Sequence, residues 1–371
     1  MIYNIFLILA IISIVIYIFY VIIFHKGLKN RSKFFIKKFE KVSVIVAARN
    51  EEKNISKLLT ILTNQTYPED KYEIIIANDG STDKTEEIVK FFQSKFENVF
   101  LLNVKDRETA ISPKKNALQQ AIDFSKGDII LLTDADCIPK TTWIEAMISS
   151  YESGIDMIVG YSSTKLDNWK KSNLAQKYEF FDFVAMFIAN SGAILSGRYF
   201  SCSGQNLSYR KSAFQDVGGF SKIKHIESGD DVNLMQLFRK ANKKITITLN
   251  SKSFVQTHPI RDWKQLINQR IRWASNTKWQ ILLNPELFFY LMAVLILMFS
   301  LVYFAIFNFK IALILFFIKS LTEYLFISKN SSLFHVQKER VHFYPIWAII
   351  HPFYILVVGV LGQLDFFKWK K

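Results

Sequence analysis

The sequence predicts an α/β domain with a largely parallel sheet, flanked by transmembrane helices. Two observations carry this prediction. Uncharged stretches near both ends have the length that a membrane-spanning helix needs, and between them short apolar runs alternate with amphipathic segments. Hydrophobic residues make up 50% of the 371 residues, yet 47 Lys and Arg stand against 32 Asp and Glu. This combination excludes an intrinsically disordered chain and is unusual for a soluble globular protein of this size.

The first uncharged stretch, residues 2–24, is long enough to cross the hydrocarbon core as a helix. A signal peptide would have a shorter apolar run after a basic start and a cleavage site of small residues, and the sequence shows neither. The basic residues that follow the stretch are Lys26, Lys29, Arg31, Lys33, Lys37, Lys38 and Lys41. Because Lys and Arg accumulate on the cytoplasmic side of a span, the N-terminus is predicted to lie outside and the next domain in the cytoplasm. We expect the inner (plasma) membrane of a bacterium.

The C-terminal region is predicted to hold three more spans. The apolar runs are residues 287–307, 311–327 and 343–364. The second run contains Lys319 and Glu323, four residues apart on one helix face, which either form an ion pair that stabilises the bundle or line a substrate path. Four spans would place the basic C-terminal tail outside, against the positive-inside rule, so the third or fourth segment could instead be re-entrant.

Between the spans, short apolar runs predict strands that are buried on both faces. These runs are residues 42–48, 72–77, 99–104 and 128–133. The stretches between them have helical spacing and are residues 51–63, 83–95 and 113–125. This alternation is typical of parallel strands joined by right-handed crossovers. Ligands bind such sheets at the carboxyl ends of the strands, so the polar residues after each run are the candidates for a site.

Acidic residues follow two of the predicted strands. Asp79 could accept hydrogen bonds from a ribose or a base, although an Asp here could also form a turn or cap. Asp134 and Asp136 flank one small residue, so on an extended chain both carboxylates point to the same side. Such a pair can hold a hard divalent cation, Mg²⁺ or Mn²⁺, whose other ligands come from water and phosphate oxygens. Surface turns also produce this pattern, but an apolar strand before it favours a metal site.

Further motifs continue along the chain in a fixed order. The motif segments are residues 42–51, 78–81, 134–136, 204–210, 217–220 and 229–234, and residues 269–273, which read Gln-Arg-Ile-Arg-Trp and fit a Q-x-x-R-W motif. Together they resemble the ordered motifs of the family 2 glycosyltransferases, over residues 42–278. Asp230 stands where that family more often has Glu, and Ala47 where many members have Pro. The resemblance implies the GT-A fold, which is Rossmann-like.

The resemblance also implies a reaction and roles for named residues. The reaction is transfer of a sugar from a nucleotide-sugar, most often a UDP-sugar, to a hydroxyl, with inversion at the anomeric carbon. Asp231 matches the general base of the family, and Asp230 beside it could raise the pKa of that base or bind the acceptor. The alternative is that these two acids only begin a helix. The residues expected to contact the donor are Arg49, Glu51, Asp79, Lys114 and Asp134. Lys114 could equally be a solvated helix residue.

A helix over residues 262–283 is predicted to rest in the membrane interface. Gln269, Arg272 and Trp273 share one of its faces, where Trp273 could stack on an acceptor sugar and Arg272 could bind the departing diphosphate. The opposite face, predicted to meet lipid, carries Trp263, Ile267, Ile271 and Ala274. A plain amphipathic helix that closes the domain is the alternative. His258 just upstream is a further candidate for the nucleotide or metal site.

The predicted order of domains is a transmembrane helix (1–25), a basic linker (26–41), a GT-A domain (42–260), an interfacial helix (261–285), about three C-terminal spans (286–365) and a basic tail (366–371). Nucleic-acid binding is disfavoured despite the net charge of +15, because the charge clusters beside the spans. A non-catalytic scaffold is disfavoured by the intact acids. Four spans favour a single transfer to a lipid or lipid-linked acceptor over processive polymer synthesis. Two cysteines cannot build a disulfide framework or a Cys-rich zinc module.

Overall fold

The computed structural model describes residues 2–30, 39–106 and 112–367, which form two compact units. We call them the sheet unit, Ser32–Lys165 with Ser201–His258, and the helical unit, Met1–Arg31 with Leu166–Phe200 and Pro259–Lys371. Some of the basic residues that the sequence places beside the membrane lie outside the described residues: Arg31, Lys33, Lys37, Lys38, Lys368, Lys370 and Lys371.

The sheet unit is built on a seven-stranded sheet with the order β3-β2-β1-β4-β8-β6-β9. In chain order the strands are β1 (Val42–Ala48), β2 (Tyr72–Asn78), β3 (Val99–Asn103), β4 (Ile129–Leu132), β6 (Met157–Val159), β8 (Leu207–Arg210) and β9 (Ile245–Ile247). The four strands predicted from apolar runs pair in parallel, each within one residue of its predicted bounds. The α/β fold is therefore confirmed. The sequence did not predict that β8 runs antiparallel to its neighbours β4 and β6.

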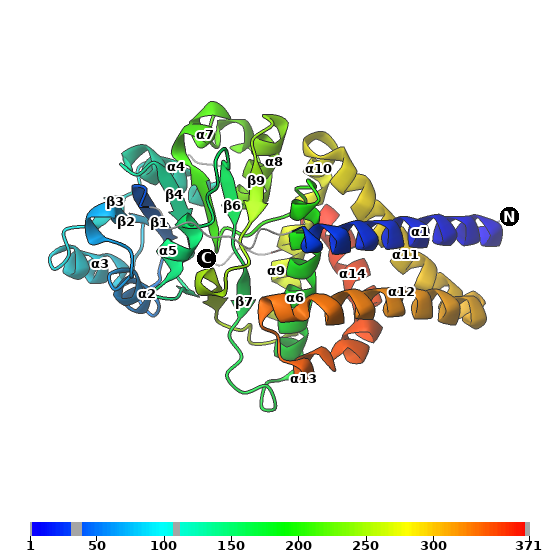
Figure 1. Cartoon of the computed structure of the whole chain (residues 1–371). Helices are drawn as coiled ribbons and strands as arrows, with labels where there is room; N and C mark the ends of the chain where they lie inside the picture. The colour runs from blue at the N-terminus through cyan, green and yellow to red at the C-terminus, as the bar shows by residue number, and fades with distance from the viewer. Residues whose placement is uncertain (1, 31–38, 107–111, 368–371) are drawn as a thin grey trace. The chain divides into compact units, whose positions relative to one another are not determined.

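Helices cover both faces of this sheet (Figure 1). They are α2 (Ile55–Leu62), α3 (Thr85–Gln93), α4 (Pro113–Phe124), α5 (Trp143–Ile148), α7 (Lys211–Asp216) and α8 (Asp230–Lys240). The side chains of Val42, Val44 and Val46 on β1 share one buried apolar cluster with α2, α3 and α5, while α4 packs on β1 and β2. The alternation of β1 side chains between two apolar layers explains why the strand reads as a continuous apolar run.

A second, three-stranded sheet has the order β5-β10-β7. Its strands are β5 (Cys137–Ile138), β7 (Ser162–Thr164) and β10 (Val255–Thr257). The fully buried Asn206 ties the surrounding segments together, because its Nδ2 donates to Tyr161 O and Ser253 O, both at 2.9 Å. Its Oδ1 accepts from Trp143 Nε1 at 3.0 Å. A buried amide with its donors and acceptor satisfied in this way fixes the segment just before β8.

The helical unit contains five helices that are long and apolar enough to cross a membrane: α1 (Ile2–Lys29), α6 (Leu174–Leu195), α11 (Pro285–Phe307), α12 (Phe309–Asn330) and α14 (Tyr344–Gln363). This finding is consistent with a membrane protein. Shorter helices in the unit are α9 (Trp263–Ala274), α10 (Thr277–Leu283) and α13 (Lys338–Val341). The sequence predicted four of the long helices and missed α6, which carries buried acids and is mostly covered by protein. The helix predicted over residues 262–283 is interrupted at Ser275 and Asn276.

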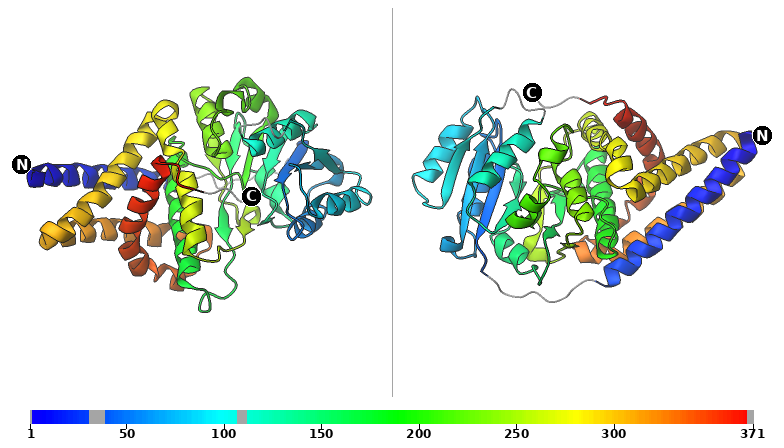
Figure 2. Two further views of the ribbon diagram at one scale, coloured as in Figure 1. Left: turned by 180° about the vertical axis from the view of Figure 1, so that it is seen from behind. Right: turned by 90° about the horizontal axis from the view of Figure 1, so that it is seen from above.

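Within the helical unit, α1, α11 and α12 pack together, and α6, α9 and α14 run across them (Figures 1 and 2). Lys319 and Glu323 form a buried ion pair at 2.6 Å. Glu323 also accepts from Tyr17 OH at 2.5 Å on α1 and from Tyr344 OH at 2.9 Å on α14. The pair thus joins three helices, which favours the bundle-stabilising reading of these two residues.

The helices α1 and α6 approach each other closely at two glycines. A Cβ on Gly27 would lie 2.2 Å from Gly192 O, and a Cβ on Gly192 would lie 2.3 Å from Phe24 O. Beside them, Ser196 Oγ donates to Ile23 O at 3.0 Å. Small residues permit this kind of close backbone contact between helices in membranes, and a larger residue at either glycine would force the helices apart.

Candidate active site

Asp79 lies at the carboxyl end of β2, directly after a fully buried strand. Its N–H donates to Ala48 O at 2.9 Å, which places it beside the end of β1. Asp79 is 7% exposed, and this burial raises the pKa of its carboxyl, while the nearby Arg49 guanidinium opposes the shift. The structure therefore brings Asp79 and Arg49 together at the edge of the sheet where parallel strands leave room for a ligand.

Glu51 takes part in contacts that join the loops after β1 and β2. Its N–H donates to Thr85 Oγ1 at 2.8 Å, and its Oε2 accepts from Asn54 Nδ2 at 2.7 Å. Asn50, which has φ of +55°, accepts from Thr82 N at 2.8 Å across the same gap. These bonds also explain why the predicted helix over residues 51–63 begins only at Ile55. The donor contact expected of Glu51 stays a prediction.

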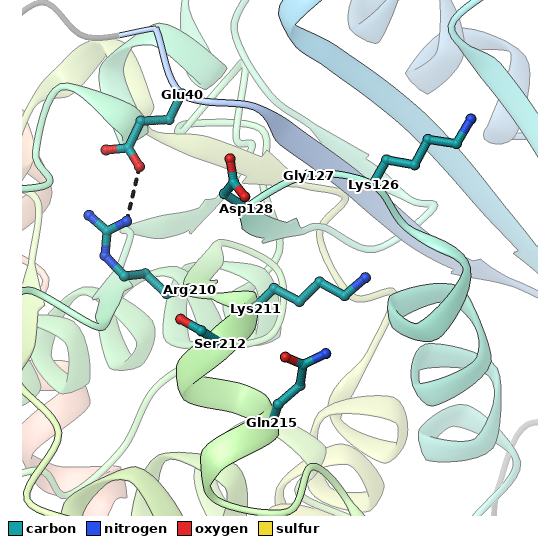
Figure 3. A pocket seen from close by; sticks show the side chains of 8 residues that line it. All are labelled: Glu40, Lys126, Gly127, Asp128, Arg210, Lys211, Ser212 and Gln215. Carbon is teal, nitrogen blue, oxygen red and sulfur yellow. Dashed lines mark hydrogen bonds and ion pairs between the residues drawn. The ribbon is translucent and has the colours of Figure 1, made fainter.

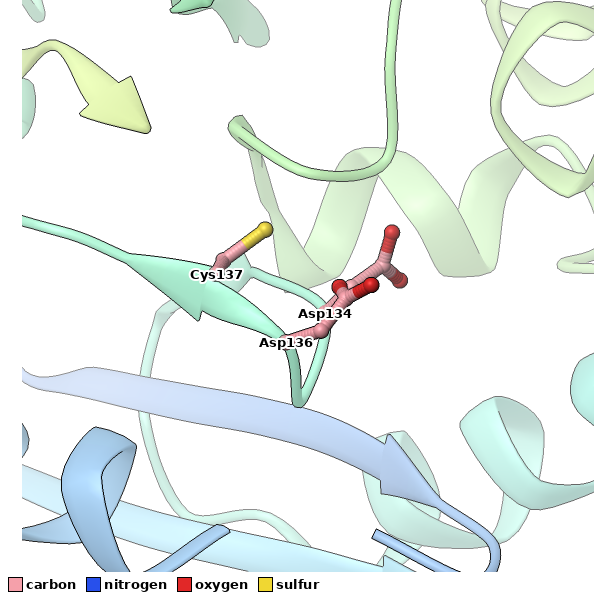
Figure 4. A group of neighbouring side chains, drawn as sticks. All are labelled: Asp134, Asp136 and Cys137. Carbon is pink, nitrogen blue, oxygen red and sulfur yellow. The ribbon is translucent and has the colours of Figure 1, made fainter. Parts of the chain in front are cut away.

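Asp134, Asp136 and Cys137 offer ligand atoms that all lie within 4.8 Å of one another. Figure 4 shows the two carboxylates pointing the same way from the turn after β4. Burial raises the pKa of the Cys137 thiol well above its ordinary value, so the sulfur stays protonated and is a poor metal ligand. The remaining oxygen donors fit Mg²⁺ or Mn²⁺. His258, the other candidate ligand, is exposed after β10 and lies outside this group, so its role stays a prediction.

Lys114, on the first turn of α4, links the Asp134 turn to the acidic pair on α8. Its Nζ lies 3.0 Å from Asp134 Oδ1 and 3.5 Å from Asp230 Oδ2. Burial disfavours the charge of the ammonium group, but Asp134, Asp230 and Asp231 together outweigh it and raise the pKa of Lys114 above its ordinary value. The Lys114 side chain is 42% exposed, so it is partly solvated and at the same time paired with two carboxylates. Three segments that are far apart in the sequence therefore meet around one positive charge.

Asp231 has the electrostatic environment that a general base needs. Its burial, and then the like charge of Asp230, raise the pKa of the Asp231 carboxyl to about 6, against an opposing effect of Lys114. Two backbone N–H groups orient the carboxylate: Gly204 N donates to Oδ2 and Val232 N to Oδ1, both at 2.7 Å. A carboxylate with a pKa just below neutral is mostly ionised at pH 7, yet it binds a proton more readily than an ordinary Asp does.

The loop before Asp230 is held by a residue that sequence reasoning missed. Lys115 is 2% exposed, and its Nζ donates to Ile226 O at 2.5 Å, to Ser228 O at 3.2 Å and to Glu227 O at 3.3 Å. Gly229 follows with φ of +71°, a conformation that suits glycine, and α8 then begins with the acidic pair. Asp230 and Asp231 do begin a helix, which was the alternative to a catalytic role, and they also lie near Lys114. No pattern in the sequence distinguishes Lys115 from its neighbour Lys114.

The residues of the Q-x-x-R-W motif lie on α9 in the helical unit. The buried member is Arg270, whose Nη2 lies 3.2 Å from Asp182 Oδ2 on α6 and whose guanidinium carbon lies 4.2 Å from the centre of the Trp273 ring. Gln269 and Arg272 are half-buried. Lipid contact was predicted for Ile271, and this is wrong, because Ile271 is 4% exposed and α9 packs along α14. The facing residues Trp263, Ile267 and Ala274 are half-buried.

A cavity of about 410 Å³ lies at the opposite edge of the main sheet, at the amino ends of β1 and β4. Figure 3 shows its lining, which consists of Glu40, Lys126, Gly127, Asp128, Arg210, Lys211, Ser212 and Gln215. Arg210 is tied to Glu40 by an ion pair of 2.9 Å, and Lys211 Nζ donates to Ser125 O at 2.6 Å. This cavity is separate from the carboxylates at the carboxyl ends of the strands, which remain the candidate site.

Comparison with known proteins agrees with this geometry. Residues 43–218 match the profile of glycosyl transferase family 2. The chain is a glycosyltransferase in which just under half of the residues resemble family 2. The glycosyltransferase AglE of Haloferax volcanii is 28% identical over 232 residues, which are 62% of this chain and 71% of that protein. The beta-monoglucosyldiacylglycerol synthase of a Nostoc species is 26% identical over 238 residues, which are 63% of this chain and 48% of that protein. The match thus spans about half the length of the Nostoc enzyme.

The fold of this glycosyltransferase also has a solved counterpart. The mannosyltransferase PcManGT of Pyrobaculum calidifontis, solved in complex with GDP-Man and Mn²⁺, superposes with a TM-score of 0.60. The likeness covers 96% of this chain and 99% of that one, at 16% sequence identity. At so low an identity it concerns the fold alone, and it supports the GT-A assignment made from the sequence.

Proposed function

We propose that this glycosyltransferase moves a sugar from a nucleotide-sugar, in the first instance a UDP-sugar, to a lipid or lipid-linked acceptor at the cytoplasmic face of the membrane, with inversion at the anomeric carbon. One observation carries the proposal. Lys114 contacts both Asp134 and Asp230, and its charge also acts on Asp231, whose pKa is raised to about 6, so a base and a cation-binding carboxylate lie around one ammonium group. Inverting transfer needs both on opposite sides of the sugar.

Asp231 serves as the base that takes the proton of the acceptor hydroxyl. The N–H groups of Gly204 and Val232 fix its carboxylate before the acceptor arrives. Removal of a proton by a positioned carboxylate is typically worth about 10²–10⁴ in rate. Asp230 acts on this base through its charge, because it raises the pKa of Asp231 and shares Lys114 with Asp134.

The donor diphosphate binds beside Lys114 and the Asp134 turn. Asp134 and Asp136 have the hard oxygen ligands to hold Mg²⁺ or Mn²⁺, which when bound offsets the charge of the leaving diphosphate. Lys114 is charged at neutral pH and adds a fixed positive group next to these carboxylates. We assign Asp79, at the end of β2, and Arg49, just after β1, to the nucleoside and its phosphates, which their proximity to each other supports.

The acceptor is assigned from the membrane helices and from the names of the relatives. One relative is a beta-monoglucosyldiacylglycerol synthase, and another, from Haloferax volcanii, is a glucosyl-dolichyl phosphate glucuronosyltransferase. Five helices apolar enough to span a membrane keep this chain where such lipids are found. Gln269, Arg272 and Trp273 on α9 are the residues we assign to the acceptor and the diphosphate. Processive polymer synthesis is the second candidate, supported by the Q-x-x-R-W motif at residues 269–273.

A donor screen tests the proposal. Membranes that contain candidate lipid acceptors would be incubated with UDP- and GDP-sugars, with Mg²⁺ or Mn²⁺, and nucleotide release would be measured. We expect release with one donor class and a lipid product that carries one added sugar. In Asp134→Ala, metal-dependent nucleotide binding should weaken at least tenfold, while the surface control Asp216→Ala should bind like the wild type. A long homopolymer from one donor would replace single transfer by processive synthesis, and no release from any donor would support the scaffold.

A further inference from the structure

Three of the apolar helices in the helical unit have their ends at the same two levels. At one end Asn308 Nδ2, between α11 and α12, donates to Tyr3 OH on α1 at 2.9 Å. At the other end the side chains of Asn330 on α12 and His25 on α1 lie 3.2 Å apart, and Tyr20 OH donates to Glu286 Oε1 at the start of α11 at 3.1 Å. The helices α1, α11 and α12 therefore run between the same two levels, as helices that cross one bilayer do.

The helix α6 cannot cross a bilayer together with them, although it is apolar enough. The chain enters α6 shortly after β7 and leaves it shortly before β8, and both strands belong to the sheet unit. A single crossing would put these strands on opposite sides of the membrane. Moreover, the last turn of α6 lies against α1 near its C-terminal end, where Ser196 Oγ bonds Ile23 O. Both ends of α6 thus lie on the side of the membrane on which α1 ends.

The helix α14 also returns to the side on which it starts. Before it, Arg340 on α13 donates from Nη2 to Leu166 O at 3.2 Å, and Leu166 follows β7 by two residues. After it, Asp365 forms an ion pair with Lys278 on α10, which comes just before α11 begins. Both partners belong to segments that precede α11 in the chain, so both contacts lie on the side of the membrane on which α1 ends and α11 begins. A helix of 20 residues is about 30 Å long, so a crossing would have carried one end to the far side.

The face of α14 that no other helix covers is a continuous apolar stripe. It consists of Ile346, Ile349, Phe353, Val357, Val360 and Leu364, each between 42% and 61% exposed, at spacings of three or four residues. The opposite face packs on protein, with Tyr178 OH 3.1 Å from His351 Nδ1 and the Trp347 ring 5.6 Å from that of Phe181. In the ribbon, α14 runs across α1, α11 and α12 (Figure 2). A one-sided apolar stripe on a helix that lies across the spans suits a bilayer surface.

We propose that the chain crosses the membrane three times, through α1, α11 and α12, and that α14 lies in the plane of the leaflet in which α1 ends and α11 begins, with its stripe among the lipid acyl chains. This inference rests on the proposed placement of the chain in a membrane and not on its activity. It also explains the charge of the C-terminal tail. Three spans put the N-terminus and the tail on opposite sides, so Lys368, Lys370 and Lys371 join the other basic residues on the cytoplasmic side.

Accessibility of single cysteines tests the number of spans in the full-length protein. Phe366→Cys reports the end of α14, Lys53→Cys the sheet unit and Phe307→Cys the far end of α11, and the unchanged chain controls for its two buried cysteines. A membrane-impermeant maleimide would be applied to intact cells and to inside-out vesicles. We expect Phe366→Cys to react in the same preparation as Lys53→Cys and opposite to Phe307→Cys. Reaction of Phe366→Cys together with Phe307→Cys would overturn the proposal.

Depth measurements test the orientation of α14 independently. Spin labels at Ile349, Phe353, Val357 and Val360 span 12 residues of α14, which are 11 steps along the helix. Labels at Ile314, Phe317, Leu321 and Leu325 span the same length on the exposed face of α12. Along a spanning helix this length changes depth by about 16 Å. We expect the collision ratio of oxygen to a nickel chelate to vary steeply along α12 and to stay nearly constant along α14. An equally steep gradient on both helices would refute the in-plane placement.

Discussion

The two units differ in the charges that lie next to their buried carboxyl groups. In the helical unit, buried charges lie beside opposite charges, as in Arg270 with Asp182 at 3.2 Å and Lys319 with Glu323 at 2.6 Å. In the sheet unit, Asp231 lies beside the like charge of Asp230, which raises its pKa. The difference teaches that the same carboxyl group is structural where a partner neutralises it, and reactive where a neighbour of like charge leaves it ready to take a proton.

Removal of the reactive carboxylate of Asp231 should have the largest effect on the protein. In Asp231→Asn the acceptor hydroxyl has no base, so we expect the rate of sugar transfer to fall by about 10²–10⁴-fold. Nucleotide affinity should stay the same, because the donor contacts are assigned to other residues. Transfer rate and nucleotide binding would be measured on the same preparation, with the exposed Glu97→Gln as control. Transfer at the wild-type rate in Asp231→Asn would mean that the base is misassigned.

Breaking the buried ion pair of Lys319 and Glu323 in the helical unit should lower the stability of the protein. In Lys319→Met, Glu323 loses its cationic partner, and breaking a buried pair costs about 3–5 kcal/mol. We expect a clear loss in the free energy of unfolding, measured by thermal unfolding in detergent or nanodiscs. The double variant Lys319→Met with Glu323→Gln leaves no charge behind and should regain most of that loss. If the single and the double variant were equally unstable, the ion pair would not be the reason.

Lys115 is a buried cationic side chain in the sheet unit that holds the loop before the reactive carboxylates. Lys115→Met removes the donor to the carbonyls before Gly229, and buried acceptors without partners cost about 1–3 kcal/mol. We expect a lower kcat with little change in nucleotide affinity, and a shift in the acid limb of the pH profile that a purely structural role would not cause. The exposed Lys126→Met is the control. An unchanged pH profile in Lys115→Met would limit this residue to stabilising the fold.

The smallest expected effect concerns pH. Below about pH 6 Asp231 takes up a proton, so kcat/KM should fall as the pH drops through that value. Asp230→Asn removes the neighbouring negative charge, which lowers the pKa of Asp231 and moves the acid limb to lower pH, by up to about one unit. Profiles of kcat/KM against pH for both proteins would show this. A shift toward higher pH would mean that the charge of Asp230 does not raise the pKa of the base.

The sequence predicted the parallel half of the sheet closely, since runs such as β1 and β2 are buried on both faces and leave a plain pattern. It also predicted Asp134 and Asp136, whose spacing alone places two carboxylates on one side. It could not predict the antiparallel β8, because strand direction depends on partners that are far away in the chain. The meeting of Asp134 with Asp230 at Lys114 likewise depends on the fold, and only the family resemblance suggested it.

Burial of charged residues was the main property that sequence reasoning could not supply. Lys115 and Arg270 look like ordinary surface residues in the sequence, yet both are buried against partners that are distant along the chain. The helix α6 was missed for the same reason, because Glu179 and Asp182 interrupt its apolar pattern. Glu179 accepts from the backbone N–H of Ile260 in the loop before α9, and Asp182 pairs with Arg270 on α9. Periodicity reports how a segment faces its surroundings, and it carries no information about which polar neighbour compensates a charge.

The glycine contact between α1 and α6 means that the first helix does more than attach the protein to the membrane. Gly27 and Gly192 allow two backbones to touch, and no generic hydrophobic segment reproduces that fit. An exchange of α1 for the anchor of an unrelated protein would keep the enzyme at the bilayer but would lose this contact with α6. The N-terminal helix is therefore a structural part of the helical unit, and membrane attachment alone cannot replace it.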